Sequence, residues 1–248
     1  MSPFALLWSL LVVDPLIILS TILCGLVSVG ASLFDSTGHA AIQVARVWSR
    51  SLLFFARVGV KVEGLEKFDS GASYVFCSNH LSYMDTPVVL SRIPAEFRFL
   101  AKEGLFQIPL LGTHLKQAGH IPVPREDPRR AIRTMTGAGK IMRERGVSLL
   151  IFPEGGRSHD GVLQPFKEGA AYIAIKAQAP LVPVAVMGTR EILAMGSAVF
   201  HAGRVRLRIG RPIPTEGLTL RDRKALTEAA HEQIAAMLET EAGVNPRK

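Results

Sequence analysis

Apolar residues dominate the N-terminal segment of the chain and give it a composition unlike the rest. Between Pro3 and Phe34 the only formally charged residue is Asp14, and Pro15 directly after it divides the stretch in two. The second part, Leu16–Phe34, is nineteen residues without a charge, which is just long enough to cross a bilayer. We expect a membrane element here, either one span or two helices hinged at Asp14-Pro15 that dip into one leaflet. The alternative is a buried N-terminal helix of a soluble fold.

The next segment, HAAIQVARVWSRSLLFFARVGVKV, has the pattern of a basic amphipathic helix. One helical face carries Gln43, Arg46, Arg50 and Arg57. Beside an apolar anchor such a helix suits an anionic membrane surface, and the alternative is the solvated face of an ordinary packed helix. The clustered arginines predict that most of the chain lies on the cytoplasmic side. A secretory signal peptide is not expected, because no Lys or Arg precedes the apolar segment and no convincing cleavage site follows it.

Beyond this segment, strand-like apolar runs alternate with longer helical ones. Strands are expected at 73–78, 97–101, 120–123, 147–152, 180–188 and 204–210, the last as an edge strand with one wet face. Helices are expected from Asp85 onward and at 103–119, 127–146, 169–178 and 219–241. We therefore predict membrane-associated helices over 1–58 and an α/β domain over 59–248. Its sheet should be mixed, mostly parallel, and flanked by helices on both faces.

Composition and charge narrow the class of partners. Apolar residues make up 48% of the 248-residue chain, which is high for a soluble protein. The net charge is +8, and because Asp14 is the only charge before residue 35, the rest of the chain carries one positive charge more, +9. Phosphate-rich partners are therefore expected, but no nucleic-acid motif is present and a membrane anchor argues against nucleic acid. Cys24 and Cys77 have neither metal-like nor disulfide-framework spacing, so we assign them to packing.

The stretch NHLSYMD places His80 and Asp85 five positions apart, directly after the predicted strand 73–78. Folds of the α/β class usually build their sites at the carboxyl ends of strands. Asp85 stands where a helix should begin and could cap backbone amides. It could instead fold back to one imidazole nitrogen of His80, fix the tautomer and leave the other nitrogen free to accept a proton. The H-x4-D spacing alone does not decide between these roles.

Two other chemistries fit this stretch less well. A Ser-His-Asp hydrolase needs a nucleophile, but the chain has no G-x-S-x-G elbow, and Ser82 lies too close to His80 in sequence to serve simply as one. A metal site needs more ligands, and the spacing of His114 and His120 to His80 is not specific. We therefore expect no metal site.

Glycines and basic residues follow other predicted strands. The stretch FPEGGRS combines two glycines, which let the backbone approach a ligand closely, with Arg157, whose planar fork can hold a phosphate. Its Glu154 can accept a hydrogen bond from a hydroxyl; the alternative is a tight turn with a solvated Arg–Glu pair. GHIPVPR ends in Arg125, and Lys102 opens KEGLF. Each of these cations alone is more typical of a surface, but their shared placement beyond strand ends indicates a site.

In this order, NHLSYMD, KEGLFQIPLLG, GHIPVPR, FPEGGRS with FKEGA, and LVPVAVMG resemble the motifs of the glycerolipid acyltransferases. The resemblance is greatest to the 1-acylglycerol-3-phosphate acyltransferases and covers about residues 60 to 190, roughly half the chain. The hydrophobic N-terminus also resembles that of bacterial members, whose paired N-terminal helices attach them to the membrane. The resemblance implies that His80 is the general base and that Asp85 is the carboxylate that orients it.

The resemblance also implies a set of substrate-binding residues. Arg125 would bind the acceptor phosphate with Lys102 beside it, and the set as a whole is Asn79, Lys102, Arg125, Glu154, Gly155, Gly156 and Arg157. The family usually has threonine at the position of Gly156, so a hydroxyl contact is missing here or replaced by water. Pro183 matches the proline of the last motif, which is structural or related to the acyl chain.

The expected reaction is acyl transfer from a fatty acyl thioester to the free sn-2 hydroxyl of lysophosphatidate, which forms phosphatidate in phospholipid biosynthesis. The thioester, acyl-CoA or acyl carrier protein, is a co-substrate, and no bound cofactor is required. The expected partners are these substrates and anionic membrane lipids, and the expected location is the cytoplasmic face of the cytoplasmic membrane. The alternatives are another acceptor (glycerol 3-phosphate, a lysophospholipid or an aminoacyl lipid), a non-catalytic membrane lipid-binding protein, or a lipid hydrolase that uses His80 with water.

Overall fold

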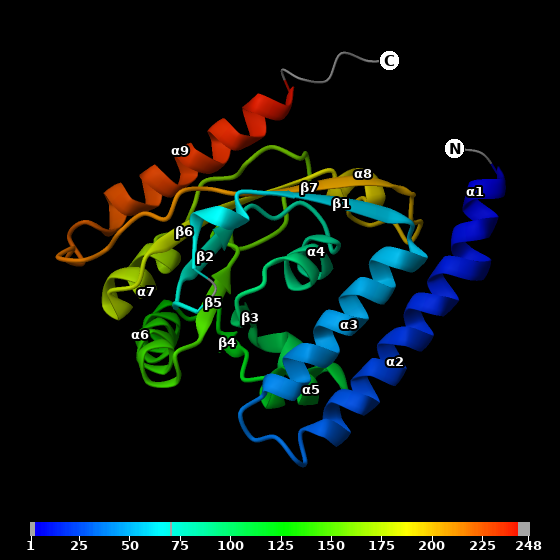
Figure 1. The fold of residues 1–248 in the computed structure, drawn as a ribbon, viewed down its shortest axis with the longest axis horizontal. Helices are drawn as coiled ribbons and strands as arrows, with labels where there is room; N and C mark the ends of the chain where they lie inside the picture. Colours follow the sequence, from blue (N-terminus) through cyan, green and yellow to red (C-terminus); the bar gives the residue numbers. More distant parts are fainter. Residues whose placement is uncertain (1–2, 70, 243–248) are drawn as a thin grey trace.

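The N-terminal part of the chain is one apolar helix that runs along the outside of the molecule (Figure 1). The computed structural model describes residues 3–69 and 71–242. Within it, this helix comprises α1 (Pro3–Trp8), a π-helical turn (Ser9–Val13) and α2 (Asp14–Ala31). The span Leu6–Ala31, with a mean hydropathy of 2.5, is long and apolar enough to cross a membrane. Of the two arrangements considered, the hinge at Asp14-Pro15 is not seen: the helix continues through it, because the wider π-helical turn accommodates the proline ring and its missing N–H.

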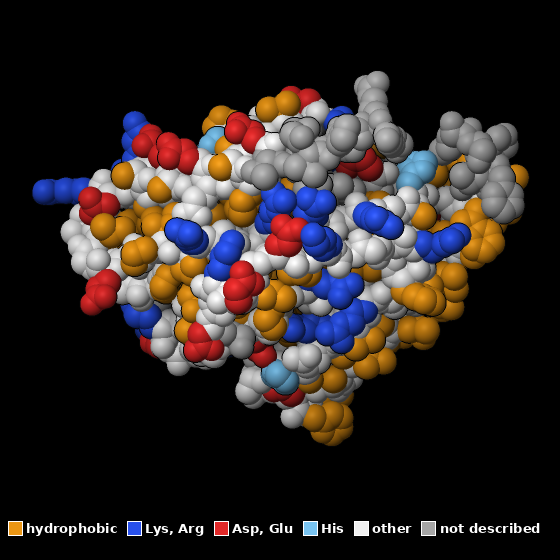
Figure 2. Space-filling model, turned by 45° about the horizontal axis from the view of Figure 1, so that its top comes forward, with side chains coloured by type: hydrophobic (Ala, Val, Ile, Leu, Met, Phe, Trp, Pro, Cys, Tyr) orange, Lys and Arg blue, Asp and Glu red, His pale blue; other side chains and the backbone are white. Residues whose placement is uncertain are grey.

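Polar contacts tie one side of α2 to the rest of the fold. Ser20 Oγ lies 2.8 Å from Ser51 Oγ, and Trp48 Nε1 donates a hydrogen bond to Thr21 Oγ1 at 2.9 Å. Ser51 and Trp48 both belong to α3 (His39–Phe55). The outward side of the whole N-terminal helix exposes large apolar residues, among them Leu11 in the π-helical turn and Ile18, Leu19, Ile22, Leu23, Leu26 and Val27 in α2. Figure 2 shows hydrophobic side chains gathered along the side on which this helix lies, with Lys and Arg side chains on the adjoining face.

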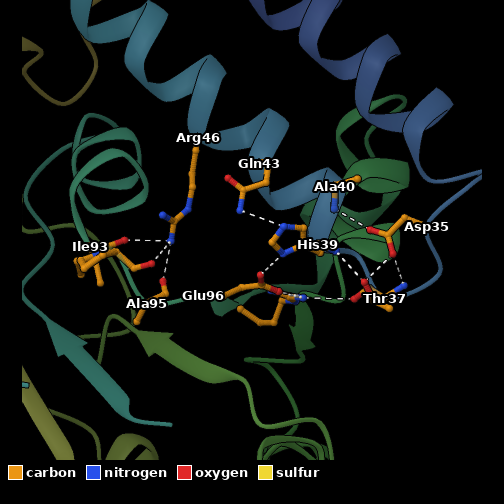
Figure 3. Close-up of polar contacts among 11 residues, drawn as sticks. Asp35, Thr37, His39, Ala40, Gln43, Arg46, Ile93, Ala95 and Glu96 are labelled. Carbon is orange, nitrogen blue, oxygen red and sulfur yellow. Dashed lines mark hydrogen bonds and ion pairs between the residues drawn. The ribbon is translucent and has the colours of Figure 1, made fainter. Parts of the chain in front are cut away.

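One residue of the polar face of α3, Arg46, packs against protein. Arg46 Nη2 donates hydrogen bonds to the carbonyls of Ile93 at 3.0 Å, Pro94 at 3.1 Å and Ala95 at 2.7 Å. About two turns earlier His39 Nδ1 bonds with Glu96, as Figure 3 shows. Gln43, Arg50 and Arg57, which the pattern places on the same face, are exposed, whereas Arg46 is held by protein. Its guanidinium instead satisfies carbonyls at the end of a helix, which have no partner within the helix.

The basic segment does not continue as a helix to its end. Residue Arg57 lies beyond α3 in a left-handed conformation with φ of 55°, and strand β1 (Val58–Glu63) begins directly after it. The alternating valines of VGVKV suit a strand better than a helix, and they pair in parallel with β7 (Gly203–Ile209). The prediction of β7 as an edge strand is consequently wrong, because β1 covers that edge.

Seven strands form one sheet in the order β1-β7-β6-β2-β5-β3-β4. The other five are β2 (Val75–Ser78), β3 (Phe97–Lys102), β4 (Ile121–Val123), β5 (Ser148–Ile151) and β6 (Leu181–Met187). Only the β6–β7 pair among these described strands is antiparallel, so the predicted mixed, mostly parallel sheet is confirmed. The central strands β2, β5 and β6 are buried along their whole length, as their continuous apolar sequences require.

Helices cover both faces of the sheet (Figure 1). They are α4 (Asp85–Arg92), α5 (Leu111–Gln117), α6 (Pro128–Arg145), α7 (Gly169–Ala177), α8 (Thr189–Ile192) and α9 (Arg223–Ala242), with 3₁₀ turns at Leu65–Lys67 and Glu103–Gln107. Residues of α3 and α4 share one apolar core with the sheet, and α6, α7 and α9 share another across it. The helix predicted over 103–119 is interrupted around Pro109, between the 3₁₀ turn Glu103–Gln107 and α5.

Candidate active site

The predicted site residues converge because four parallel strands end at the same edge of the sheet. Strands β2, β5, β3 and β4 are neighbours and run in the same direction. His80 follows β2, Glu154 follows β5, Lys102 ends β3 and Arg125 follows β4. This edge is where α/β folds carry their sites.

The carboxylate of Asp85 folds back onto the loop that carries His80. Asp85 Oδ2 lies 2.7 Å from His80 Nδ1 and also accepts the backbone N–H groups of Leu81 at 2.7 Å and Ser82 at 2.8 Å. Asp85 thus begins helix α4, holds the loop before it and orients the imidazole; the backbone amides that it accepts belong to that loop and not to the helix. With Nδ1–H donating to the carboxylate, Nε2 is the basic nitrogen of the neutral ring.

Thr189 completes the surroundings of Asp85 and was not predicted from the sequence. Its Oγ1 donates a hydrogen bond to Asp85 Oδ1 at 2.5 Å, and both residues are fully buried. Thr189 begins α8 directly after Gly188, which has φ of 87° and lies after β6. The sequence shows a threonine directly after the LVPVAVMG strand, but 104 residues separate it from Asp85, so the sequence does not indicate that the two are in contact.

The imidazole of His80 is stacked on an aromatic ring and largely buried. The ring centroids of His80 and Phe152 are 3.9 Å apart with an interplanar angle of 14°, and His80 is 7% exposed. Burial lowers the pKa of His80 below its ordinary value of 6.5; Asp85 opposes this shift, and the positive charges of Arg157 and Arg125 act with burial. The ring is therefore held neutral and ready to accept a proton near neutral pH.

Asn79 has a different role from the one predicted. Its Nδ2 donates to the carbonyl of Val186 at 2.9 Å, and its Oδ1 accepts the N–H of Val186 at 2.8 Å, with the side chain fully buried. The amide therefore continues the β2–β6 pairing beyond the end of β2. This placement does not support Asn79 as a substrate ligand.

Ser82 is also used structurally, which agrees with its exclusion as a nucleophile. Its Oγ donates to the carbonyl of Leu193 at 2.7 Å and accepts the N–H of Met84 at 3.1 Å. His120, considered as a metal ligand, accepts the backbone N–H of Phe99 through Nδ1 at 2.9 Å.

Two arginines from neighbouring loops lie close enough to His80 for their charges to lower its pKa. The guanidinium of Arg157 lies over the ring of Tyr83, 3.8 Å from its centroid, and its buried Nε has no hydrogen-bond partner among the described residues. Arg125 Nη1 donates to the carbonyl of Gly155. Lys102 lies farther out, exposed and 3.9 Å from Glu126. The structure thus brings Arg157 and Arg125 together around His80 and leaves Lys102 at the rim.

The side chain of Glu154 points toward the backbone of the histidine loop. Its Oε1 accepts the N–H of His80 at 2.6 Å and its Oε2 accepts the N–H of Gln164 at 3.1 Å. Burial raises the pKa of Glu154 to about 7, and the charge of Asp85 acts in the same direction, whereas the two amides oppose it.

The two adjacent glycines of FPEGGRS differ in what they require. Gly155 has φ of 78°, and a Cβ there would lie 2.7 Å from Lys167 Nζ, whereas a Cβ at Gly156 meets no atom within 4 Å among the described residues. A threonine, as found in the family motif, would therefore have room at Gly156.

Gly155→Ala is expected to lower the free energy of unfolding by about 1–2 kcal/mol, because a side chain is strained in the left-handed region. Gly156→Ala is the matched control and should change it by less than about 0.5 kcal/mol. Thermal and urea unfolding of both variants in detergent check this difference, and equal losses would contradict it.

An apolar cavity of about 410 Å³ lies on the other side of the aromatic stack. Residues of α2, α3, α4 and α5 line it, and the lining includes Trp48, Leu90, Phe99, Leu110 and His114. Phe99 joins it to the site, because its ring is 6.2 Å from that of Phe152, which stacks on His80. A cavity so largely apolar suits a hydrocarbon chain.

The comparison with known proteins agrees with this geometry. The family model described as Acyltransferase matches residues 59–187, which include His80, Asp85, Arg125 and Arg157. The crystal structure of the 1-acyl-sn-glycerophosphate (LPA) acyltransferase PlsC from Thermotoga maritima superposes with a TM-score of 0.73 at 26% identity, covering 95% of this chain and 98% of that one.

Named relatives also match over most of the chain. The chloroplastic 1-acyl-sn-glycerol-3-phosphate acyltransferase BAT2 of Brassica napus is 36% identical over 68% of this chain and 49% of its own length, so the chain spans about half of that relative. The human 1-acyl-sn-glycerol-3-phosphate acyltransferase alpha is 30% identical over 78% of this chain and 68% of its own length. On the family match, these relatives and the shared fold, the chain belongs to the acyltransferase family.

Proposed function

We propose that this protein transfers a fatty acyl group from a thioester to the sn-2 hydroxyl of lysophosphatidate and forms phosphatidate. The His80–Asp85 pair carries the proposal, with His80 Nδ1 2.7 Å from Asp85 Oδ2. The charges of Arg157 and Arg125 act on His80, and the apolar cavity begins at Phe99. The names of the relatives support this acceptor.

His80 Nε2 would take the proton of the acceptor hydroxyl as its oxygen attacks the thioester carbonyl. The C–S bond then breaks, and the imidazolium returns the proton to the departing thiolate, which leaves a free thiol and the new ester. Between these two proton transfers Asp85 stabilises the imidazolium, because its Oδ2 accepts the hydrogen bond of Nδ1–H. Base catalysis of this kind typically contributes about 10²–10⁴-fold.

Arg157 and Arg125 would hold the acceptor phosphate and so place its hydroxyl at His80. A planar guanidinium forms paired hydrogen bonds with phosphate oxygens, and Arg157 Nε is buried without a partner among the described residues. A phosphate would satisfy that donor. Lys102 would act only at the rim, through its charge. The acyl chain of the thioester would enter the apolar cavity beyond Phe99.

The long apolar helix would bring the site to its lipid substrate. Its inner side is fastened to α3 and α5 by polar contacts at Ser20, Thr21 and Ser28, and its outer side is apolar. Because the α/β fold lies alongside the helix, we propose that the outer face is immersed in the cytoplasmic leaflet. Anionic lipids and the phosphates of the donor would be attracted by the net charge of +8.

Purified protein in detergent with oleoyl-CoA and lysophosphatidate tests the proposal, with lipid products separated and identified by mass. Phosphatidate and free thiol in equal amounts are expected. The same assay with glycerol 3-phosphate, lysophosphatidylcholine and monoacylglycerol compares acceptors, and acyl carrier protein thioester replaces the CoA donor in parallel. Product from monoacylglycerol at the same rate would contradict a phosphate-binding role for the arginines, and free fatty acid without an acylated product would indicate a hydrolase.

The rate should depend on pH through His80. Because burial lowers its pKa, the neutral base of the free enzyme persists below the ordinary range, and kcat/KM for the acceptor should rise with pH with a midpoint below 6.5. The measurement is kcat/KM between about pH 4.5 and 8, within the range where histidine changes charge. A midpoint above 6.5 would show that the ring is protonated more easily than its burial implies.

A further inference from the structure

One carboxylate bridges two loops around the catalytic histidine. Glu154 Oε1 accepts the backbone N–H of His80, and Oε2 accepts that of Gln164. Strand β2 ends at Ser78, so the N–H of His80 has no strand to pair with. A buried N–H group without a partner is costly, and the carboxylate removes that cost.

The rest of the same turn holds His80 at other points. The N–H of Ser158 donates to the carbonyl of His80 at 2.8 Å, and Phe152 stacks on its ring at 3.9 Å. The turn over 152–158 therefore contacts the amide, the carbonyl and the ring of the histidine, while Asp85 holds Nδ1. Two of these contacts are hydrogen bonds that fix the backbone of His80. The bond from Ser158 is made by its backbone, whereas the bond to the amide of His80 is made by the side chain of Glu154.

We propose that Glu154 is a positioning residue, which fastens the backbone of His80 to the FPEGGRS turn, and is not a ligand of the acceptor. The inference rests on the proposed function and names a different role for Glu154 within the same site. Both carboxylate oxygens are already engaged by fixed backbone donors, whereas Arg157 and Arg125 offer the donors that an anionic acceptor needs.

The role predicts a specific change in kinetics. In Glu154→Gln one oxygen becomes an NH₂ group that faces a backbone N–H, so one of the two ties is lost at nearly constant volume; in Glu154→Ala both are lost. We expect kcat to fall about 10-fold in the first and about 10²-fold in the second, since a misplacement of about 1 Å has effects of this size. The KM for lysophosphatidate should stay within about twofold, because the phosphate contacts remain.

Hydrogen–deuterium exchange provides a readout that does not depend on turnover. The backbone amides of His80 and Gln164 should exchange faster in Glu154→Ala than in the wild type, while those of the β6 strand should not change. Glu216→Gln, which alters an exposed carboxylate before α9, is the matched control and should change neither kinetics nor exchange. Circular dichroism confirms that each variant is folded.

Two outcomes would overturn the inference. A rise of about 10-fold or more in the acceptor KM with kcat preserved would make Glu154 a ligand, and unchanged exchange at His80 in both variants would show that the tie does not hold the loop. If the wild type transfers no acyl group to any acceptor, the proposed function fails, and the exchange result still decides whether Glu154 holds His80.

Discussion

His80→Ala is expected to reduce kcat for phosphatidate formation by at least about 10³-fold, within the range that general bases contribute. The variant loses the only basic nitrogen that the structure places against Asp85 among the described residues. The acceptor KM should change little, because the arginines on the neighbouring loops remain. Initial rates with oleoyl-CoA and lysophosphatidate measure both quantities.

His159→Ala is the matched control for this variant. His159 is exposed, two residues after Arg157, and its backbone carbonyl accepts a hydrogen bond from Arg190. Its rate should equal that of the wild type. Equal phosphatidate formation by His80→Ala and the wild type would exclude His80 as the base, whereas loss of lysophosphatidate binding would indicate that His80 serves the acceptor site and not the proton transfer.

Asp85→Asn is expected to reduce kcat by about 10²–10³-fold while the protein remains folded. The side-chain oxygen of asparagine can take the place of Oδ2, which now accepts three N–H groups. Its NH₂ group can then donate a hydrogen bond to Thr189 Oγ1, because a hydroxyl also accepts. The loop geometry is thus retained. The acceptor for Nδ1 becomes neutral, however, and hydrogen bonds to a neutral acceptor are about half as strong as those to a charged one. The imidazolium therefore loses most of its stabilisation.

The pH profile distinguishes this explanation from a simple loss of structure. Asp85 raises the pKa of His80 against the effect of burial, so removal of its charge should move the midpoint of the kcat/KM profile to a lower pH. Asp222→Asn is the control, since that carboxylate accepts two hydrogen bonds from Thr219 at the surface near the start of α9. It should leave kcat and the midpoint unchanged. A profile that is unshifted in Asp85→Asn would contradict the electrostatic role of the carboxylate.

Most strands and helices could be predicted because their local pattern and their tertiary surroundings agree. The run SLLI is apolar after its first residue and forms the fully buried β5. Asp127 followed by Pro128 begins α6, where the Asp127 side chain caps the N–H of Arg130. Predictions were wrong where a neighbour decided the outcome. VGVKV was included in a helix because its pairing partner β7 lies about 145 residues later, and β7 was placed at an edge for the same reason.

The sequence alone determined which residues stand at the ends of strands, and so the set of His80, Asp85, Arg125 and Arg157 that forms the candidate site. This was possible because parallel strands bring their carboxyl ends to one edge whatever the order of the strands. Only the tertiary structure decided how each side chain is used. It directs Asn79 to the backbone of β6, adds Thr189 behind Asp85 and turns Glu154 toward the amide of His80. Such contacts join segments 74 to 107 residues apart, and no local pattern carries them, because a polar side chain takes the donor or acceptor that folding leaves without a partner.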